Sequence, residues 1–285
     1  MIAMVVSRVM AAESSPGPSS TLFERLLTDG TCIVKLSPAE AGHLAEFYRE
    51  SAVFFASDTA VKERYSVPNR VSGYRPHGYA HAGYPDQPDL NDSFLYWQRR
   101  RAHLPHQEEI SSFLDAAEAF RAATVRIARE VIESMRKFYK YEPELPFERA
   151  SVLQVNSFAE PTDRKLLQQR HEDAILLTVI STSAEGLEGF YNGNVKAVTL
   201  EPDEVMVMPG SVMTMMTGGR IEPFYHQVRN YHHLDRKSII YFVSPDADGA
   251  IEPFVRNEVN EGVDIRALVI DNPQTFGLSE DFVTA

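Results

Sequence analysis

The sequence predicts a mainly β fold with flanking helices, and three observations support this prediction. Helical patterns dominate the chain up to about residue 140. Beyond residue 150, short β-rich runs such as "SVLQVNSF", "AILLTVIS", "EVMVMPGS" and "SIIYFVS" recur every eight to fourteen positions, separated by turn residues. No internal repeat of 20 to 50 residues is visible, which argues against a solenoid or propeller. Helices followed by strands therefore predict a β barrel or sandwich with a helical flank.

Two helices and one loop-rich segment are expected before the strands. Ser37 has the character of an N-cap, with Pro38 at the first helical position and Glu40 three residues after the cap. Residues 66 to 105 contain scattered prolines, glycines and aromatic side chains without a helical period, which favours an ordered loop that covers a site. From Glu108 to about Tyr139, apolar residues recur at spacings of three and four and predict a long amphipathic helix.

Composition limits the class of protein. The chain has 285 residues, 44% of them hydrophobic, and a formal charge of −12 from 40 acidic and 28 basic residues. This charge argues against a nucleic-acid partner or an anionic membrane surface. The single cysteine, Cys32, excludes an intrachain disulfide and a cysteine-based metal site, so a reducing, cytoplasmic location is expected.

One domain accounts for most of the chain. Residues 1–20 are expected to be a flexible tail, because "MIAMVVSRVMAA" is too short to cross a bilayer and "ESSPGPSS" follows it. Residues 21–285 are expected to form a single domain. We divide it into a helical and loop-rich part (21–149), a β core (150–245) and a C-terminal segment (246–285).

A histidine and an aspartate two residues apart, His171 and Asp173, precede the run "AILLTVIS". On a strand, residues i and i+2 point to the same face, so both side chains could converge on one metal ion. The motif is weak alone, because a polar turn would read the same way and His233 and Asp235 repeat it. A 2-His-1-carboxylate iron site needs a second histidine. Three histidines that could supply it follow the pair His171 and Asp173, namely His226, His232 and His233. No histidine follows the pair His233 and Asp235.

The order and spacing of five residues resemble the isopenicillin N synthase-like family of iron(II)/2-oxoglutarate-dependent dioxygenases. His171-x-Asp173 is followed by His226 after 55 residues and by Arg236-x-Ser238 ten residues later. "RHEDAILLTVIS" resembles the family's metal-binding strand, and "MPGSVMTMMTGGRIEPFYHQV" the stretch that leads to its distal histidine. Weaker similarities occur in "FFASDTAVKERY", "GYRPHGY" and "LQVNSF", so the resemblance covers roughly residues 20 to 245.

This resemblance implies a double-stranded β-helix, also called a jelly roll, with iron at its open end. It assigns Fe(II) binding to His171, Asp173 and His226, and 2-oxoglutarate binding to Arg236, Ser238 and Asn156. Physical chemistry agrees for the arginine, because a guanidinium in an apolar barrel is costly unless an anion meets it.

The implied reaction is oxidation of a small molecule by O₂, with release of succinate and CO₂. Hydroxylation, desaturation and ring formation are all open, and a natural product or amino-acid derivative is the expected substrate. Four residues are expected to contact the substrate: Gln154, Phe158, Arg170 and Tyr74.

Phe158 departs from the family pattern, because a tyrosine that helps to hold 2-oxoglutarate often stands at this position. Two alternatives therefore stay open. One is an Fe(II) oxidase of the isopenicillin N synthase type, which does not consume 2-oxoglutarate. The other is a jelly roll that binds a ligand without turnover.

Overall fold

The computed structural model describes residues 20–68, 70–81, 84–191, 193–246, 251–257, 263, 264 and 267. The tail expected for residues 1–20 therefore lies outside the described residues, except for residue 20. Most of the C-terminal segment 246–285 also lies outside them.

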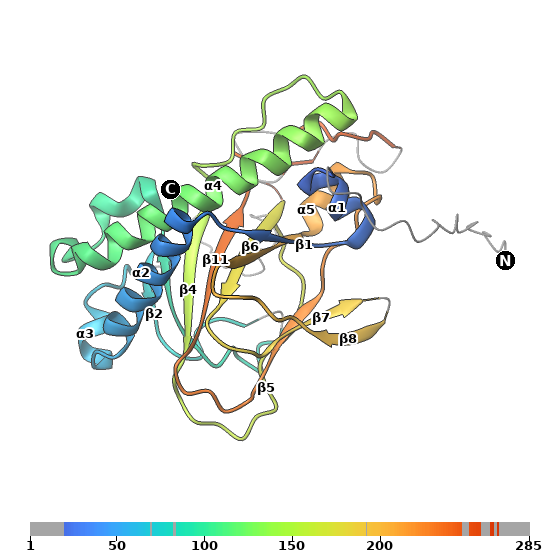
Figure 1. The fold of residues 1–285 in the computed structure, drawn as a ribbon. Coiled ribbons are helices and arrows are strands. Elements are labelled where there is room, and N and C mark those ends of the chain that lie inside the picture. The colour runs from blue at the N-terminus through green and yellow to red at the C-terminus, as the bar shows by residue number, and fades with distance from the viewer. Residues whose placement is uncertain are drawn as a thin grey trace.

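Two antiparallel sheets form the core (Figure 1). The larger sheet has seven strands in the order β1 (Cys32–Lys35), β9 (Glu204–Pro209), β6 (Leu177–Thr182), β11 (Arg236–Val243), β4 (Val152–Phe158), β3 (Asp92–Tyr96) and β2 (Gly73–Arg75). The smaller sheet has the order β5 (Leu166–His171), β10 (His226–Arg229), β7 (Leu187–Tyr191) and β8 (Asn194–Ala197).

The inner faces of the two sheets pack against each other. Ile180, Met206 and Ile240 of the larger sheet form one apolar cluster with Leu187 of the smaller sheet and with Phe224 just before β10. Residues on alternate positions of the same large-sheet strands, such as Val179 and Ile239, belong to a second cluster on the outer face. This arrangement confirms the predicted jelly-roll core, because each central strand is covered on both faces.

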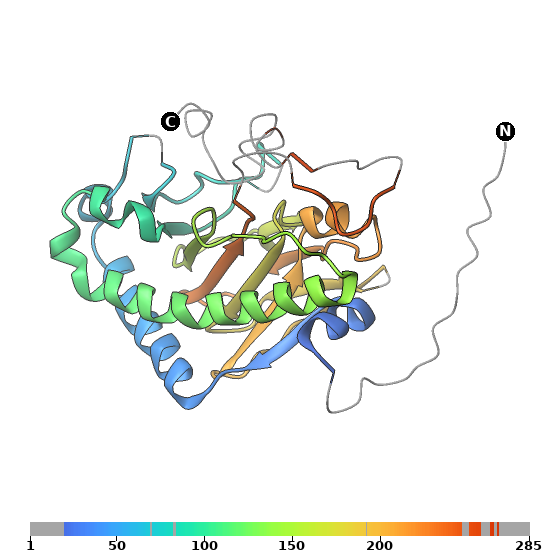
Figure 2. The ribbon, with the colours of Figure 1, turned by 90° about the horizontal axis from the view of Figure 1, so that it is seen from above.

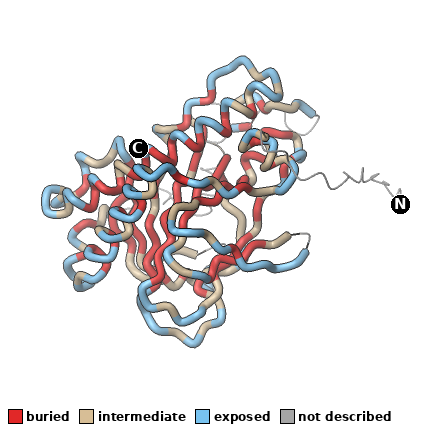
Figure 3. The backbone as a smooth tube through the Cα atoms, viewed as in Figure 1, coloured by how far each residue is buried: buried red, intermediate tan, exposed pale blue. Residues whose placement is uncertain are grey.

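Helices cover the outer face of the larger sheet. They are α1 (Leu22–Asp29), α2 (Pro38–Phe55), α3 (Thr59–Glu63), α4 (Ser111–Tyr139) and α5 (Ser211–Met216), with 3-10 helices η1 (Gln98–His103) and η2 (Gln107–Ile110). Helices α2 and α4 pack together along that face (Figure 2). The buried residues lie in the strands and on the helix sides that face them (Figure 3).

Both predicted helices are present, with one shifted start. Helix α2 has the expected capping box, in which the Glu40 amide donates to Ser37 Oγ and the Ser37 amide donates to Glu40 Oε2 at 2.9 Å. The long helix begins at Ser111 rather than Glu108. His106 adopts a left-handed conformation with φ of 50°, and the residues after it form the 3-10 helix η2 before the α-helix starts.

The loop-rich segment 66–105 contains more regular structure than its sequence indicates. It contributes β2 and β3 to the edge of the larger sheet. Their short runs of three and five residues have too few positions to show a clear period. Among the described helices, none is both long and apolar enough to cross a membrane.

Phe54 is central to the packing of α2 on the larger sheet. Its side chain is buried and its ring is 4.9 Å from that of Phe113 on α4 and 5.2 Å from that of Phe94 on β3, between ring centroids. One side chain therefore joins two helices and a strand.

We expect Phe54→Ala to lower the free energy of unfolding by about 3–5 kcal/mol, because it leaves a cavity among aromatic rings. Chemical denaturation would measure this loss. The matched control is Val53→Ala at the neighbouring position, where the side chain is 62% exposed, and it should change stability little. Equal losses in the two variants would contradict the assigned role of Phe54.

Candidate metal centre

The two histidines of the candidate centre are cross-strand neighbours. His171 ends β5 and His226 begins β10, and these residues are directly paired in the antiparallel ladder. Their ring centroids are 4.2 Å apart. Residues 55 positions apart in the sequence are thus brought together by strand register.

Asp173 completes the group from the turn that follows β5. Its Oδ1 lies 3.8 Å from His171 Nε2 and 4.0 Å from His226 Nε2. The three potential ligand atoms lie within 4.8 Å of one another. Among the described residues, this is the group of three histidine, cysteine or acidic side chains with that geometry.

Hydrogen bonds orient both imidazoles. Nδ1 of His171 lies 2.7 Å from the carbonyl oxygen of Gln169, and Nδ1 of His226 lies 3.3 Å from that of Phe224. A carbonyl can only accept, so each Nδ1 carries the proton and donates it. Both Nε2 lone pairs are consequently free for a metal, which is the usual arrangement around metal-binding histidines.

The two carboxylate oxygens of Asp173 have different neighbours. Thr178 on β6 donates from Oγ1 to Asp173 Oδ2 at 2.5 Å, while Oδ1 faces the histidines. The hydroxyl therefore favours a one-oxygen ligand, which leaves more coordination positions open than a two-oxygen ligand would.

The protonation state of His226 favours binding of a metal cation at neutral pH. Burial, helped by the neighbouring His171, lowers its pKa to about 4. The imidazole is therefore neutral at pH 7, and a metal need not displace a proton from Nε2.

The backbone of the turn that carries Asp173 is tightly enclosed. The amide of Ser211 donates to the Asp173 carbonyl at 3.0 Å. At Gly210, a Cβ atom would lie 2.4 Å from the Asp173 carbonyl oxygen and 2.1 Å from that of Ile175. Only glycine fits there without moving the turn.

Arg236 is a buried cation with a spare donor. Its side chain is 1% exposed, Nε donates to the Glu185 carbonyl at 3.0 Å, and Nη1 donates to Ser238 Oγ at 2.9 Å. Nη2 is buried and has no hydrogen-bond partner within the described part of the chain. Burial lowers the pKa of Arg236 to about 10, which still leaves it charged at neutral pH.

Three of the residues expected to bind cosubstrate or substrate surround this arginine. Phe158 faces Arg236 across the β4–β11 ladder, with its ring centroid 4.9 Å from the guanidinium carbon. Asn156 is paired with Ser238 in the same ladder, and its Oδ1 accepts from Gln154 Nε2 at 2.7 Å. Gln154, Asn156 and Phe158 alternate along β4, so they share the face that carries Arg236 and Ser238.

The structure does not bring Tyr74 or Arg170 to this group. Tyr74 belongs to the helix-covered core, where its ring packs near Phe54. Arg170 precedes His171 on β5 and so points to the opposite face, where its guanidinium lies 4.7 Å from the Phe190 ring and 4.3 Å from the Tyr225 ring. Neither placement favours contact with a substrate at the candidate centre.

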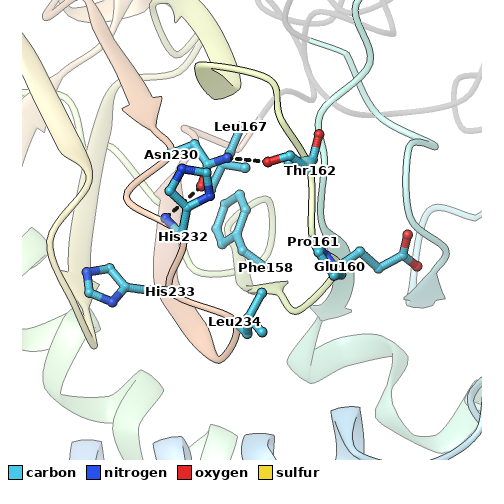
Figure 4. Close-up of a pocket in the computed structure, with 9 residues that line it drawn as sticks. All are labelled: Phe158, Glu160, Pro161, Thr162, Leu167, Asn230, His232, His233 and Leu234. Atoms are coloured by element: carbon cyan, nitrogen blue, oxygen red, sulfur yellow. Dashed lines mark hydrogen bonds between the residues drawn. The ribbon is translucent and has the colours of Figure 1, made fainter.

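Phe158 also borders a separate pocket beyond the arginine. The pocket lies between the segments 158–162 and 230–234 (Figure 4). Asn230 connects these segments, because its Nδ2 donates to the Thr162 carbonyl at 2.9 Å and its Oδ1 accepts from the His232 amide at 2.8 Å. His232 and His233 line this pocket, away from the group formed by His171, Asp173 and His226.

Comparison with known proteins identifies the domain. Residues 148–245 match the model of the 2OG-Fe(II) oxygenase superfamily, and they include all three candidate ligands and Arg236. Residues 148–245 are a 2OG-Fe(II) oxygenase domain. The enzymes of this class use Fe(II), 2-oxoglutarate and O₂, so the chain is a dioxygenase with these cofactors. No curated protein matches the sequence.

Solved structures share the fold at low sequence identity. A full-length Neurospora crassa protein in complex with alpha-KG is 17% identical, with a TM-score of 0.69 and coverage of 85% of each chain. A putative 2OG-Fe(II) oxygenase family protein from Caulobacter crescentus is 17% identical, with a TM-score of 0.68 and coverage of 92% of this chain and 90% of that one. The dioxygenase for auxin oxidation 1 from Arabidopsis thaliana, bound to 2-oxoglutarate, is 21% identical, with a TM-score of 0.62 and coverage of 80% and 89%.

Thr178 was not anticipated among the site residues of this oxygenase domain. We expect Thr178→Val to weaken Fe(II) binding by about 10- to 100-fold, because the hydroxyl that orients Asp173 is lost while the side-chain shape is kept. Anaerobic metal titration would measure the change. Thr59→Val, at an exposed position on α3, is the matched control. Equal metal affinities in wild type and Thr178→Val would contradict the assigned role.

Proposed function

We propose that this dioxygenase oxidises a small molecule by hydroxylation, desaturation or ring formation, and converts 2-oxoglutarate to succinate and CO₂. The observation that carries the proposal is the unpartnered Nη2 of buried Arg236, on an inner face of a barrel that also carries a group of three potential iron ligands. A charged donor without an acceptor is costly inside a protein, so an anionic ligand is the simplest explanation for it.

His171, Asp173 and His226 would hold the iron through Nε2, Oδ1 and Nε2. When bound, Fe(II) with 2-oxoglutarate and O₂ supplies the oxidising chemistry. The protein's own contribution is to fix these three atoms. The carbonyls of Gln169 and Phe224 fix the rings, and Thr178 fixes the carboxylate.

Arg236 and Ser238 would hold the distal carboxylate of 2-oxoglutarate. Nη2 offers one charged donor, and the Ser238 hydroxyl, which already accepts from Nη1, still has its own proton to donate. Asn156, opposite Ser238, would line the same place. Phe158 cannot donate as a tyrosine would, but its ring covers the guanidinium and excludes water from the ion pair.

A small-molecule substrate fits the enclosed position of the site. His226 and Arg236 are 5% and 1% exposed, and an enclosed centre suits a ligand that can enter between two sheets. The similar structures were solved with small molecules: the Neurospora crassa protein with thymine and with 5-formyluracil, and JOX2 with JA. We propose a natural-product or amino-acid-derived substrate, with Gln154 as one of its contacts.

The proposed oxygenase unit extends from residue 21 to residue 285. Helices α2 and α4 would support the larger sheet from outside, so the N-terminal half is part of the same unit. We also propose a cytoplasmic location. It rests on Cys32, whose thiol is buried and unpaired and whose pKa is raised to about 12 by burial.

The proposed function can be tested by anaerobic titration of the Fe(II)-loaded protein with 2-oxoglutarate. The chelate should give a weak visible charge-transfer band in the wild type and no band in His226→Ala. In Arg236→Gln the band should require about 10- to 100-fold more 2-oxoglutarate, since charge-assisted hydrogen bonds are lost. Arg99→Gln, an exposed arginine outside the site, should behave as wild type.

Each other outcome has a distinct meaning. Iron binding without a band would favour an oxidase that does not use 2-oxoglutarate, for which Phe158 is the supporting residue. A wild-type protein that binds no iron would favour a non-catalytic jelly roll, and the proposed function would then be abandoned.

A further inference from the structure

A short segment before β3 lies against the strand that carries the first metal ligand. The amide of Leu90 donates to the Leu167 carbonyl on β5 at 2.9 Å, and the amide of Asp89 donates to the Ala80 carbonyl at 2.8 Å. The segment therefore connects the loop before it to the smaller sheet. It carries two buried polar side chains, those of Asp89 and Asn91, of which Asp89 contacts β5 directly.

Asp89 is a buried carboxylate with one unused oxygen. It is 7% exposed, and its Oδ2 accepts from Gln168 Nε2 at 3.1 Å. Its Oδ1 is enclosed and accepts no hydrogen bond from any residue that the structure describes. Gln168 stands three positions before His171 on β5, so the carboxylate contacts the strand that carries the first candidate ligand.

Burial raises the pKa of the Asp89 carboxyl group, and its neighbours oppose this rise. In decreasing order these are His171, the hydrogen bond from Gln168, His81 and Arg164.

Asn91 adds a second acceptor of the same kind. It is 5% exposed, and its Nδ2 donates to the Asp92 carbonyl at 3.1 Å. Its Oδ1 is buried and lacks a donor within the described ranges. Asp89 and Asn91 are buried on either side of the half-buried Leu90, an alternation that places both side chains on the same side of the segment.

Two enclosed acceptors without donors require an explanation. A buried polar atom without a partner costs about 1–3 kcal/mol, and more for a charged group. An ammonium group supplies what both oxygens lack, because it has three donors and one positive charge. A neutral N–H group would satisfy one oxygen only, whereas the charge of an ammonium adds to the attraction that the nearby Arg164 exerts on the carboxylate.

We infer that Asp89 Oδ1 and Asn91 Oδ1 form a subsite that binds a protonated amine of the substrate beside the metal centre. The substrate class is then a small primary or secondary amine, such as an amino-acid derivative. This inference rests on the proposed function, because it assumes that substrate is oxidised at the centre of His171, Asp173 and His226.

The test uses the full chain loaded with Fe(II) and 2-oxoglutarate under anaerobic conditions. The probes are propylamine, benzylamine and tryptamine, each paired with its N-acetyl derivative. Binding is followed through the change in the visible spectrum of the chelate. In the wild type, at least one amine should bind with a Kd of about 1 mM or tighter and at least tenfold better than its acetylated partner.

Asp89→Asn keeps the shape of the side chain and removes its charge, so the preference for the amine should fall below about threefold. Asp86→Asn is the matched control, since it is the same change at an exposed position in the same segment and should leave the preference intact. Thermal unfolding of the apoprotein separates ligand binding from a structural role. A ligand-binding Asp89 predicts that Asp89→Asn unfolds at an equal or higher temperature, because the cost of burying a charge is removed while an acceptor for Gln168 is kept.

Three results would overturn the proposed subsite. The first is that the wild type forms the 2-oxoglutarate chelate but binds no amine at this affinity. The second is an unchanged amine preference in Asp89→Asn, and the third is a marked loss of stability in that variant. If Asp89→Asn fails to fold, Asn91→Ala provides the second measurement, with the same threefold limit. Failure to form the chelate at all would instead count against the proposed function, so the two failures are distinguishable.

Discussion

The antiparallel register between β5 and β10 is the constraint on which the site depends. It sets His171 opposite His226 and brings their rings to a separation of 4.2 Å. A slip of one residue would turn one imidazole to the opposite face of the sheet. The apolar pairing of the two inner faces opposes such a slip, because Val228 and Leu167 would lose their burial with Phe158. Hydrophobic packing of Val228 and Leu167, on the same two strands as the histidines, thus maintains the ligand geometry.

The barrel interior is divided into an apolar part and a polar part. Ile180, Met206 and Ile240 fill one part with Leu187, whereas Asn156, Arg236 and Ser238 occupy the other. In the polar part, Nη2 of Arg236 is a buried donor without a partner among the described residues, as expected where a protein binds a polar ligand. The low pKa of His226 and the lowered pKa of Arg236 have the same origin, because burial disfavours the charged form of both.

Much of this fold could be predicted from the sequence, for identifiable reasons. The capping box at Ser37 and the periodicity of α4 are local signals, and the spacing of His171 and Asp173 is local as well. Strand partners are not local. Tyr74 and Arg170 were expected at the site because of their neighbours in the sequence, yet strand alternation and pairing turn both side chains away from it. Thr178 and Asp89 gave no sequence signal, because a threonine in a β run and an aspartate in a loop are ordinary until the fold places them beside ligands.

The geometry of the metal centre also depends on Gly210, a residue that has no side chain to bind metal or substrate. It binds nothing, but the carbonyls of Asp173 and Ile175 occupy the volume that any side chain at this position would need. The close approach of two backbone segments fixes the turn that carries Asp173, and the Thr178 hydroxyl then orients its carboxylate toward both imidazoles. A chain with an intact set of iron ligands and a larger residue at position 210 would keep the sequence signature of an oxygenase and lose the shape that the signature implies.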